Sequence, residues 1–203
     1  MNIEEQKILE RCERLFMRYG AKSVTMDDVA RELAISKKTL YQYFSSKDEL
    51  VHKVTIFHFQ HHEEVVNTIC ATSQDAISEM LQVTEWVTQH LRDLNPSLIY
   101  DLSKYYPKSW QLFLDHRNTH VYHWMIENIR KGREQELYRD DFDESIIAPI
   151  YISRLEMLVD PQIFNSEIYP LNQVMPQYIQ YHIRGIATPK GIKKLEKIKT
   201  TIL

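Results

Sequence analysis

The segment from Ile35 to Leu50 concentrates side chains that can form hydrogen bonds with nucleic-acid bases and phosphates. Lysine reaches guanine or a phosphate, glutamine pairs with adenine, and tyrosine and threonine can contact the DNA backbone and thymine. Helical spacing places Leu40 and Phe44 on the inward face. The outward positions are Lys37, Lys38, Tyr41 and Gln42, with Thr39 at the edge. This face suits DNA recognition, whereas the alternative is a polar, solvated face of an unrelated helical bundle.

Short helices must position these side chains. In "TMDDVARELA", Thr25 can cap a helix with Asp28 three residues later, and Ser36 can cap the next helix after a turn of about three residues. This is the spacing of a helix-turn-helix unit. "SKDE", from Ser46 to Glu49, predicts another capping box, at the start of a helix that runs to about Thr72. Capped helix starts at Thr25 and Ser46 offer amide donors to phosphates.

The composition indicates an all-α, globular protein. Of 203 residues, 43% are apolar, and no glycine or proline occurs between Ala21 and Asn95. Further helices are expected at 8–19, 75–94, 96–105, 107–131, 144–159 and 168–185, followed by a basic helix in "TPKGIKKLEKI", and Pro176 predicts a kink. The sequence shows no apolar leader and no apolar run that could span a bilayer, so we expect a cytoplasmic location and no membrane partner.

The stretch "ILERCERLFMRYGAKSVTMDDVARELAISKKTLYQYFSSKDEL" resembles the N-terminal domain of the tetracycline-repressor (TetR) family over about a quarter of the chain. The resemblance implies that one group of residues faces bases and another holds the DNA backbone. The first group is Lys37, Lys38, Thr39 and Gln42, and the second is Thr25, Tyr41, Tyr43 and Lys47. Lys38 departs from the family pattern, which has a small residue there, so a base contact and a phosphate contact both stay open for it.

The same resemblance implies a division into a helix-turn-helix DNA-binding domain at 1–53 and a helical effector-binding and dimerisation domain at 54–203. The expected function is that of a one-component transcription regulator that acts as a repressor. It would bind a palindromic operator in double-stranded DNA as a homodimer and leave it when a small molecule binds.

Apolar residues in the two late helices predict a four-helix dimer interface. The candidates are Ile147, Ile150, Leu155 and Leu158 in one helix and Leu171, Val174 and Tyr178 in the other, and Ile146 belongs to the same apolar stripe as the first four. The alternative is that these residues pack within one chain. Aromatic residues predict a pocket for an apolar or amphipathic effector, in which Arg117 could meet an acidic group. This ligand-binding set is Trp86, Tyr105, Trp110, Phe113, Arg117 and Trp124. An ordinary aromatic core is the alternative here.

Two pairs of histidines have the spacing of metal chelates, His58 with His62 and His116 with His120. Because a metal sensor needs three or four converging ligands, the sequence favours no metal site and no cofactor. No nucleophile motif or phosphate-binding loop is present, so an enzyme is not expected. The alternatives are a metal-dependent helical enzyme and a helical interaction module without DNA binding. Cys12 and Cys70 are expected to be buried free thiols.

Overall fold

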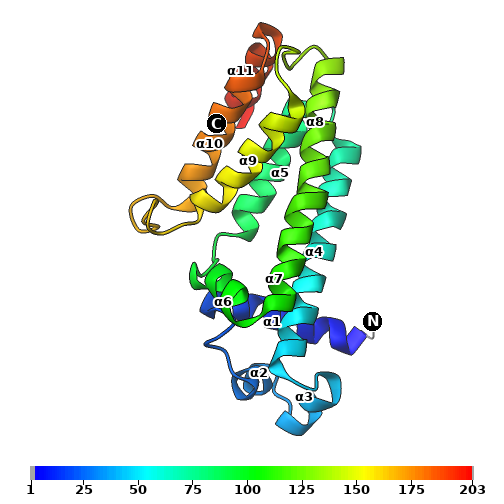
Figure 1. Cartoon of the computed structure of the whole chain (residues 1–203), viewed down its shortest axis with the longest axis vertical. Coiled ribbons are helices and arrows are strands. Elements are labelled where there is room, and N and C mark those ends of the chain that lie inside the picture. The colour runs from blue at the N-terminus through cyan, green and yellow to red at the C-terminus, as the bar shows by residue number, and fades with distance from the viewer. Residues whose placement is uncertain (1–2, 203) are drawn as a thin grey trace. The chain divides into compact units, whose positions relative to one another are not determined.

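The computed structural model describes residues 3–202, and their side chains except those of residues 3, 156 and 199–202. The prediction of an all-α fold is confirmed, since no described residue lies in a strand and the one isolated bridge pairs Tyr138 with Ala187. The helices, drawn in Figure 1, are α1 (Ile3–Tyr19), α2 (Met26–Glu32), α3 (Lys37–Tyr43), α4 (Lys47–Thr72), α5 (Ala76–His90), α6 (Ser97–Tyr105), α7 (Pro107–His116), the π-helical segment η1 (Arg117–Val121), α8 (Tyr122–Glu134), α9 (Glu144–Leu158), α10 (Leu171–Ile186) and α11 (Pro189–Ile202).

The chain forms two compact units. The first contains residues up to 63 together with 93–116, and the second contains 64–92 together with 117 onwards. Helix α4 therefore contributes its first part to one unit and its last part to the other. The division into functional domains at 1–53 and 54–203 stays a prediction, and the first compact unit differs from 1–53 because 54–63 and 93–116 pack with the N-terminal helices.

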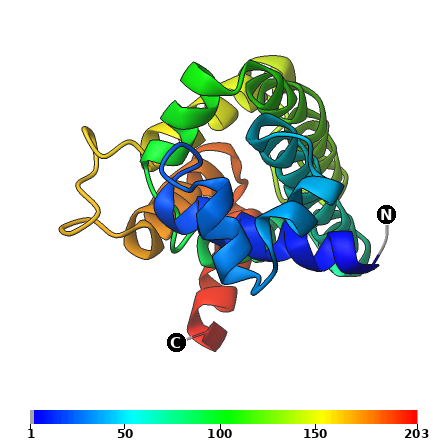
Figure 2. The ribbon, with the colours of Figure 1, turned by 90° about the horizontal axis from the view of Figure 1, so that it is seen from below.

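The first unit is held together by apolar side chains from α1 to α4 and α6. Cys12, Leu40 and Phe44 are completely buried, and Leu98 and Leu102 of α6 join the same cluster. Helices α1, α2 and α3 are the three blue elements in Figure 2. Every other residue of the short helix α3 carries a polar group. The burial of Leu40 therefore determines which side chains of the helix face outward.

The loop after α1 is tied closely to α6. Gly20 has φ +80°, a conformation that other residues rarely adopt, and a Cβ there would lie 2.6 Å from Ser97 Oγ. The carboxylate of Asp101 accepts a hydrogen bond from the backbone N–H of Lys22 at 2.9 Å. The phenol of Tyr106, directly after α6, donates to the carbonyl of Ala21 at 3.4 Å. These contacts anchor the approach to α2.

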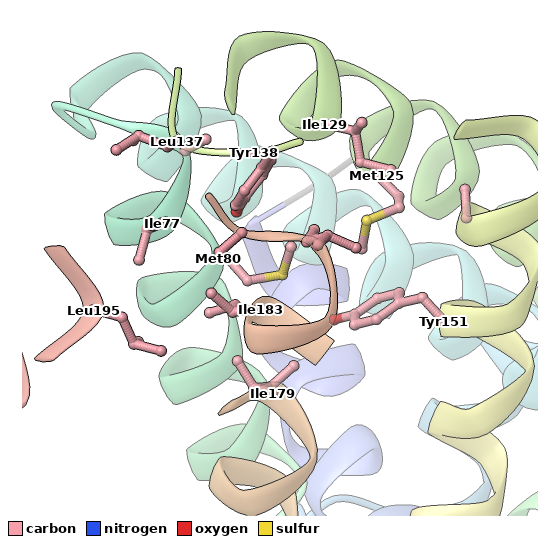
Figure 3. Close-up of a cluster of buried hydrophobic side chains, with 14 of the residues drawn as sticks. Ile77, Met80, Met125, Ile129, Leu137, Tyr138, Tyr151, Ile179, Ile183 and Leu195 are labelled. Carbon is pink, nitrogen blue, oxygen red and sulfur yellow. The ribbon is translucent and has the colours of Figure 1, made fainter. Parts of the chain in front are cut away.

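The second unit has a separate core, which Figure 3 shows in close-up. Ile77 and Met80 of α5, Met125 of α8 and Ile179 of α10 are completely or almost completely buried there. A buried polar group accompanies them, since Glu79 accepts from Lys131 Nζ at 2.7 Å and from Asn128 Nδ2 at 2.8 Å. With these two donors the buried carboxylate is paired and hydrogen-bonded, as a charge in a core must be.

Three expectations about helix boundaries need correction or refinement. The helix predicted over 107–131 contains a π-helical segment, η1, between α7 and α8. The capping box predicted at Ser46 is shifted: Ser46 Oγ accepts from Glu49 N–H, but the Glu49 carboxylate accepts from Ser45 N–H at 2.7 Å. The helix predicted at 168–185 begins at Leu171 rather than at 168.

The segment between α9 and α10, residues 159–170, forms a loop that projects from both helices in the two views (Figures 1 and 2). Within α10 the helix continues past Pro176. Among the described residues, no helix has both the length and the apolar character required to cross a bilayer.

Candidate DNA-binding surface and effector site

The start of α2 and the turn that follows it are fixed by local hydrogen bonds. Thr25 Oγ1 accepts from Asp28 N–H at 3.1 Å, and the Asp28 carboxylate accepts from Thr25 N–H at 3.0 Å, so the predicted capping box is confirmed. The hydrogen bond from the Thr25 hydroxyl to this carboxylate lowers the pKa of Asp28. Ala34 then takes φ +53°, which turns the chain towards Ser36.

Helix α3 begins at a capped end, where Ser36 Oγ accepts from Thr39 N–H at 3.0 Å. Its outward side chains match the group that the sequence placed there: Lys37, Lys38, Tyr41 and Gln42 are exposed, while Thr39 and Tyr43 are half-buried. Tyr41 is 44% exposed, although its neighbour Leu40 is completely buried. Leu40 therefore anchors the helix in the core, and the opposite side of the helix exposes polar side chains.

The three lysines of the predicted DNA-binding surface are not equivalent. Lys37 Nζ forms a 2.8 Å ion pair with Asp27 of α2, which raises the pKa of this lysine. Lys47 Nζ donates to the backbone carbonyl of Lys22 at 2.9 Å, and partial burial lowers its pKa. Lys38 and Gln42 form no ion pair or side-chain hydrogen bond with any other described residue. Their side chains are thus available for an external partner.

The six residues predicted to bind an effector are divided between the two units. Tyr105, Trp110 and Phe113 belong to the first unit, and Trp86, Arg117 and Trp124 belong to the second. In the first unit, the rings of Trp110 and Phe113 stack with centroids 4.9 Å apart, and the Tyr105 hydroxyl is hydrogen-bonded to Lys22 Nζ at 2.7 Å. Tyr105, Trp110 and Phe113 therefore pack against side chains of their own unit.

An aromatic cluster in the second unit contains Trp124 of α8, Tyr151 of α9, and Tyr178 and His182 of α10. The Tyr151 ring lies 4.6 Å from that of His182, 5.7 Å from that of Tyr178 and 6.4 Å from that of Trp124, measured between centroids. The sequence had assigned Trp124 to the effector and Tyr178 to the dimer, and it missed Tyr151 and His182. The spacing of His182 four residues after Tyr178 was the available signal.

Two buried nitrogen atoms in this cluster have no hydrogen-bond partner of normal geometry, Trp124 Nε1 and His182 Nε2. Burial lowers the pKa of His182 to about 4, so its imidazole is neutral near pH 7. The indole of Trp124 interacts with the thiol of Cys70, a weak acceptor, and burial raises the pKa of that thiol to about 11. Unsatisfied polar atoms among aromatic rings are a typical feature of ligand sites.

Both cysteines are free thiols, as expected. Cys12 is buried, and this burial raises its pKa to about 12. Cys70 is only half-buried, so the prediction of burial is met in part. With such raised pKa values neither thiol is activated as a nucleophile.

The residues predicted to form the dimer interface differ in exposure. Leu158 is only 5% exposed and packs in the core of its own chain. Ile150 is 50% exposed, and the remaining candidates are half-buried against the same core: Ile147, Leu155, Leu171, Val174 and Tyr178. The most exposed apolar side chains of α9 and α10 are Ile146 at 59% and Tyr181 at 79%. The sequence pattern had included Ile146 in the same apolar stripe, whereas it had not selected Tyr181.

Comparison with known proteins agrees with this arrangement. The family model described as "Bacterial regulatory proteins, tetR family" matches residues 8–54, which contain α2, α3 and the start of α4. The chain is 26% identical over 183 residues to the HTH-type transcriptional regulator YvaF of Bacillus subtilis, a match that covers 90% of this chain and 95% of that protein.

Solved structures share the fold of most of the chain. A TetR-family regulator from Agrobacterium tumefaciens superposes with a TM-score of 0.76 at 14% identity, and a putative transcriptional regulator from Saccharomonospora viridis, solved with choline, with a TM-score of 0.75 at 20% identity. Each match covers 91% of this chain and 98% of the other. The matched segment contains the helix-turn-helix elements, and together these similarities support a DNA-binding transcriptional regulator of the TetR family.

Proposed function

We propose that the protein is a repressor that binds a palindromic operator as a homodimer and is released by a small apolar or amphipathic molecule. The observation that carries the DNA-binding part is the outward face of α3, where Lys38 and Gln42 have no partner in the described chain. Glutamine can pair with adenine through two hydrogen bonds, and lysine can reach guanine or a phosphate. We therefore assign base reading to Lys38 and Gln42.

Lys37 and Lys47 have different parts in this proposal. Lys37 is paired with Asp27, so a phosphate must compete with a carboxylate for its ammonium group. Lys47 holds the carbonyl of Lys22 and stabilises the loop before α2. We propose that Lys47 acts mainly by positioning this loop, and that Lys37 adds a salt-dependent phosphate contact.

Selection of bound sequences from random duplex DNA tests the proposed operator. We expect enrichment of two inverted half-sites with centres about one helical turn, or roughly 34 Å, apart. Gln42→Ala should relax the base preference at one position in each half-site, whereas Gln60→Ala, at an exposed glutamine of α4, should select the same sequences as the natural protein. A selection that enriches no common sequence would refute operator recognition.

The proposed homodimer uses α9 and α10. The exposed isoleucines Ile146 and Ile150 and the tyrosine Tyr181 offer apolar area that a second copy could bury. A twofold dimer would also supply the second reading helix that an inverted repeat requires. We propose these three residues as the centre of the interface, and Leu158 as a residue of the core.

The effector site is proposed at the aromatic cluster of Trp124, Tyr151, Tyr178 and His182. Its rings offer apolar and π-electron surface, and the unpaired nitrogen atoms of Trp124 and His182 offer positions for a polar group. The related regulator from Saccharomonospora viridis was solved with choline, and aromatic faces attract quaternary ammonium groups. Choline is therefore a rational first probe.

Titration with choline, followed by tryptophan fluorescence, tests this assignment. We expect choline to bind more tightly than dimethylbutanol, its uncharged carbon isostere, because only the cation is attracted by the ring faces. Tyr151→Leu should weaken choline binding, and Tyr100→Leu, at an exposed tyrosine of α6, should leave it unchanged. Equal binding of the two compounds would exclude a quaternary ammonium effector, and a screen of apolar compounds against the Tyr151→Leu variant would then test the site itself.

Release from DNA requires that the ligand favours a conformation with weaker operator affinity. Thermodynamic linkage then demands that operator DNA weakens effector binding by the same factor, typically about 5 to 150-fold. Equal effector affinity in the presence and absence of the operator would refute induction by that molecule, while leaving the DNA-binding assignment intact.

A further inference from the structure

Two lysines from separate segments of the first unit meet at one tyrosine. Lys22 lies in the loop between α1 and α2, whereas Lys104 and Tyr105 are the last two residues of α6. Lys22 Nζ donates to the Tyr105 hydroxyl at 2.7 Å and lies 4.1 Å from the centre of the Tyr105 ring. Lys104 Nζ lies 5.5 Å from the same centre. Folding therefore brings two ammonium groups to one aromatic ring.

A second tyrosine completes this group. Lys104 Nζ donates a hydrogen bond to the Tyr100 hydroxyl, and the rings of Tyr100 and Tyr105 pack edge to face with centroids 6.4 Å apart. Lys22, Tyr100 and Lys104 are exposed, and Tyr105 is half-buried. These four residues form the lysine–tyrosine patch. Each of its ammonium groups lies over an aromatic ring, which is a favourable cation–π arrangement.

The patch keeps its positive charge, because its lysines are paired with phenols. Lys37, in the same unit, is paired with the carboxylate of Asp27. In contrast, neither Lys22 nor Lys104 forms an ion pair with a carboxylate among the described residues. The hydrogen bond from Lys22 and the charge of Lys104 lower the pKa of the Tyr105 phenol, as neighbouring positive charge does. An anionic partner would meet two ammonium groups that no carboxylate neutralises.

The backbone of Lys22 is fixed at both of its polar groups. Its N–H donates to the carboxylate of Asp101 at 2.9 Å, and its carbonyl accepts from Lys47 Nζ at 2.9 Å. Asp101 is only 5% exposed, and the hydrogen bond that it accepts comes from the backbone of Lys22 and not from the ammonium group. The position of the residue is therefore set before a partner binds, which lowers the ordering cost of a contact.

This loop leads directly into the proposed DNA-binding surface. Lys22 precedes Thr25 by three residues, which limits the distance between their Cα atoms to about 11 Å. Thr25 and Lys47, which bonds the Lys22 carbonyl, are two of the residues predicted to hold the DNA backbone. DNA carries phosphate charges at short, regular intervals beyond the bases that α3 would read. DNA is therefore a polyanion that can extend from these residues to the patch.

We propose that the lysine–tyrosine patch binds backbone phosphates of operator DNA that lie outside the base pairs read by α3. Lys22 and Lys104 make the contacts, and α6 thereby adds a surface to the one that the helix-turn-helix supplies. The inference rests on the proposed function, since it requires that the protein binds an operator. Phosphate contacts carry no sequence information, so the patch should strengthen binding to every duplex of sufficient length by the same factor.

Salt-dependent binding of the Lys22→Gln and Lys104→Gln variants tests the proposal, with the selected palindrome and an unrelated duplex of equal length. Each variant should bind both duplexes more weakly by the same factor, and the slope of log K against log salt concentration should become shallower by up to about 0.9. Lys193→Gln is the matched control, because it removes an equal charge from an exposed position of α11 in the second unit. It should change neither the affinity nor the slope.

An unchanged slope in either patch variant would overturn the inference. If Gln42→Ala still relaxed the base preference in that case, operator recognition by α3 would stand without the patch. Failure of the natural protein to bind any selected sequence would instead refute the proposed function itself. The two failures are therefore distinguishable.

A conservative variant separates charge from structure. Lys104→Arg retains the positive charge and can still lie over an aromatic ring, so it should keep the salt slope of the natural protein. Ethylation interference should locate the contact: phosphates whose ethylation weakens binding by the natural protein, but not by Lys104→Gln, should lie outside the base pairs affected by Gln42→Ala. A shallower slope in Lys104→Arg, or interference confined to those base pairs, would contradict the proposed phosphate contact.

Discussion

Asp101 of α6 accepts a hydrogen bond from the backbone N–H of Lys22 at 2.9 Å, which joins α6 to the loop before α2. The same carboxylate lies 2.9 Å from the position that a Cβ on Gly20 would occupy. The contact therefore needs both a buried acceptor at position 101 and a residue without a side chain at position 20. It holds the loop that leads to the DNA-binding helices.

Gly20→Ala should destabilise the protein. The φ of +80° costs about 1–2 kcal/mol for a residue with a Cβ, and the clash with Ser97 and Asp101 adds to it. Chemical denaturation would measure this loss. Gly185→Ala is the control, because a Cβ there meets no atom within 4 Å, and alanine in a helix should be neutral or stabilising by up to about 1 kcal/mol. Equal stability of the two variants would show that the loop relaxes freely.

Asp27→Asn should increase the affinity for DNA. The substitution removes the carboxylate that pairs with Lys37 at 2.8 Å and also removes a negative charge near the proposed phosphate contacts. The slope of log K against log salt concentration should become steeper by up to about 0.9, the contribution of one additional neutralised phosphate. Asp140→Asn removes an equal charge from an exposed position in the second unit and should not change the slope. If the Asp27→Asn variant bound DNA more weakly, the ion pair would instead hold Lys37 in the position from which it contacts a phosphate.

His182 should make the protein less stable in acid. Burial lowers its native pKa to about 4, below the unfolded value of about 6.5, so between these pH values the unfolded chain binds a proton that the native chain does not. Its contribution to stability is therefore present above pH 6.5 and is lost as the pH falls towards 4, by up to about 1.4 kcal/mol per pH unit. His182→Gln should show a shallower fall when unfolding is measured over this range. An unchanged pH profile would show that water or a shift in structure accommodates the charged imidazole.

Ile146→Asp combined with Ile150→Asp should produce monomers. Both side chains are at least half exposed on α9, so the folded chain should tolerate the charges, but an apolar contact with a second copy should not. Sedimentation would give the mass and circular dichroism the fold. The matched control is Ile163→Asp with Ile168→Asp, which changes two equally exposed isoleucines of the loop between α9 and α10. Dissociation by the control pair alone would place the interface at that loop.

Local signals in the sequence predicted much of the first unit. The capping threonine at position 25 and its partner Asp28 lie three residues apart, so the pattern contains the whole interaction. Glu49 shows the limit of such reasoning, because Ser45 and Ser46 are both within reach and only the path of the chain decides between their N–H groups. The inward positions Leu40 and Phe44 followed from helical spacing alone.

Contacts between distant segments could not be predicted in this way. The pairing of Lys37 with Asp27 depends on how α3 crosses α2, and it changes which lysine is available to DNA. Similarly, His116 meets His62 only because α7 packs beside α4, and His182 meets Tyr151 only because α10 packs beside α9. The π-helical segment at 117–121 has no sequence signature in this chain, since no proline or glycine occurs there.

The most direct test of the account is to measure binding to three duplexes of equal length: the selected palindrome, one half-site, and an unrelated sequence. We predict that two chains bind the palindrome, that the half-site binds more weakly, and that Gln42→Ala reduces the preference for the palindrome by a factor equivalent to about 1–3 kcal/mol per altered base contact. Equal affinity for all three duplexes, or a preference that Gln42→Ala leaves unchanged, would contradict the proposal that α3 reads an operator.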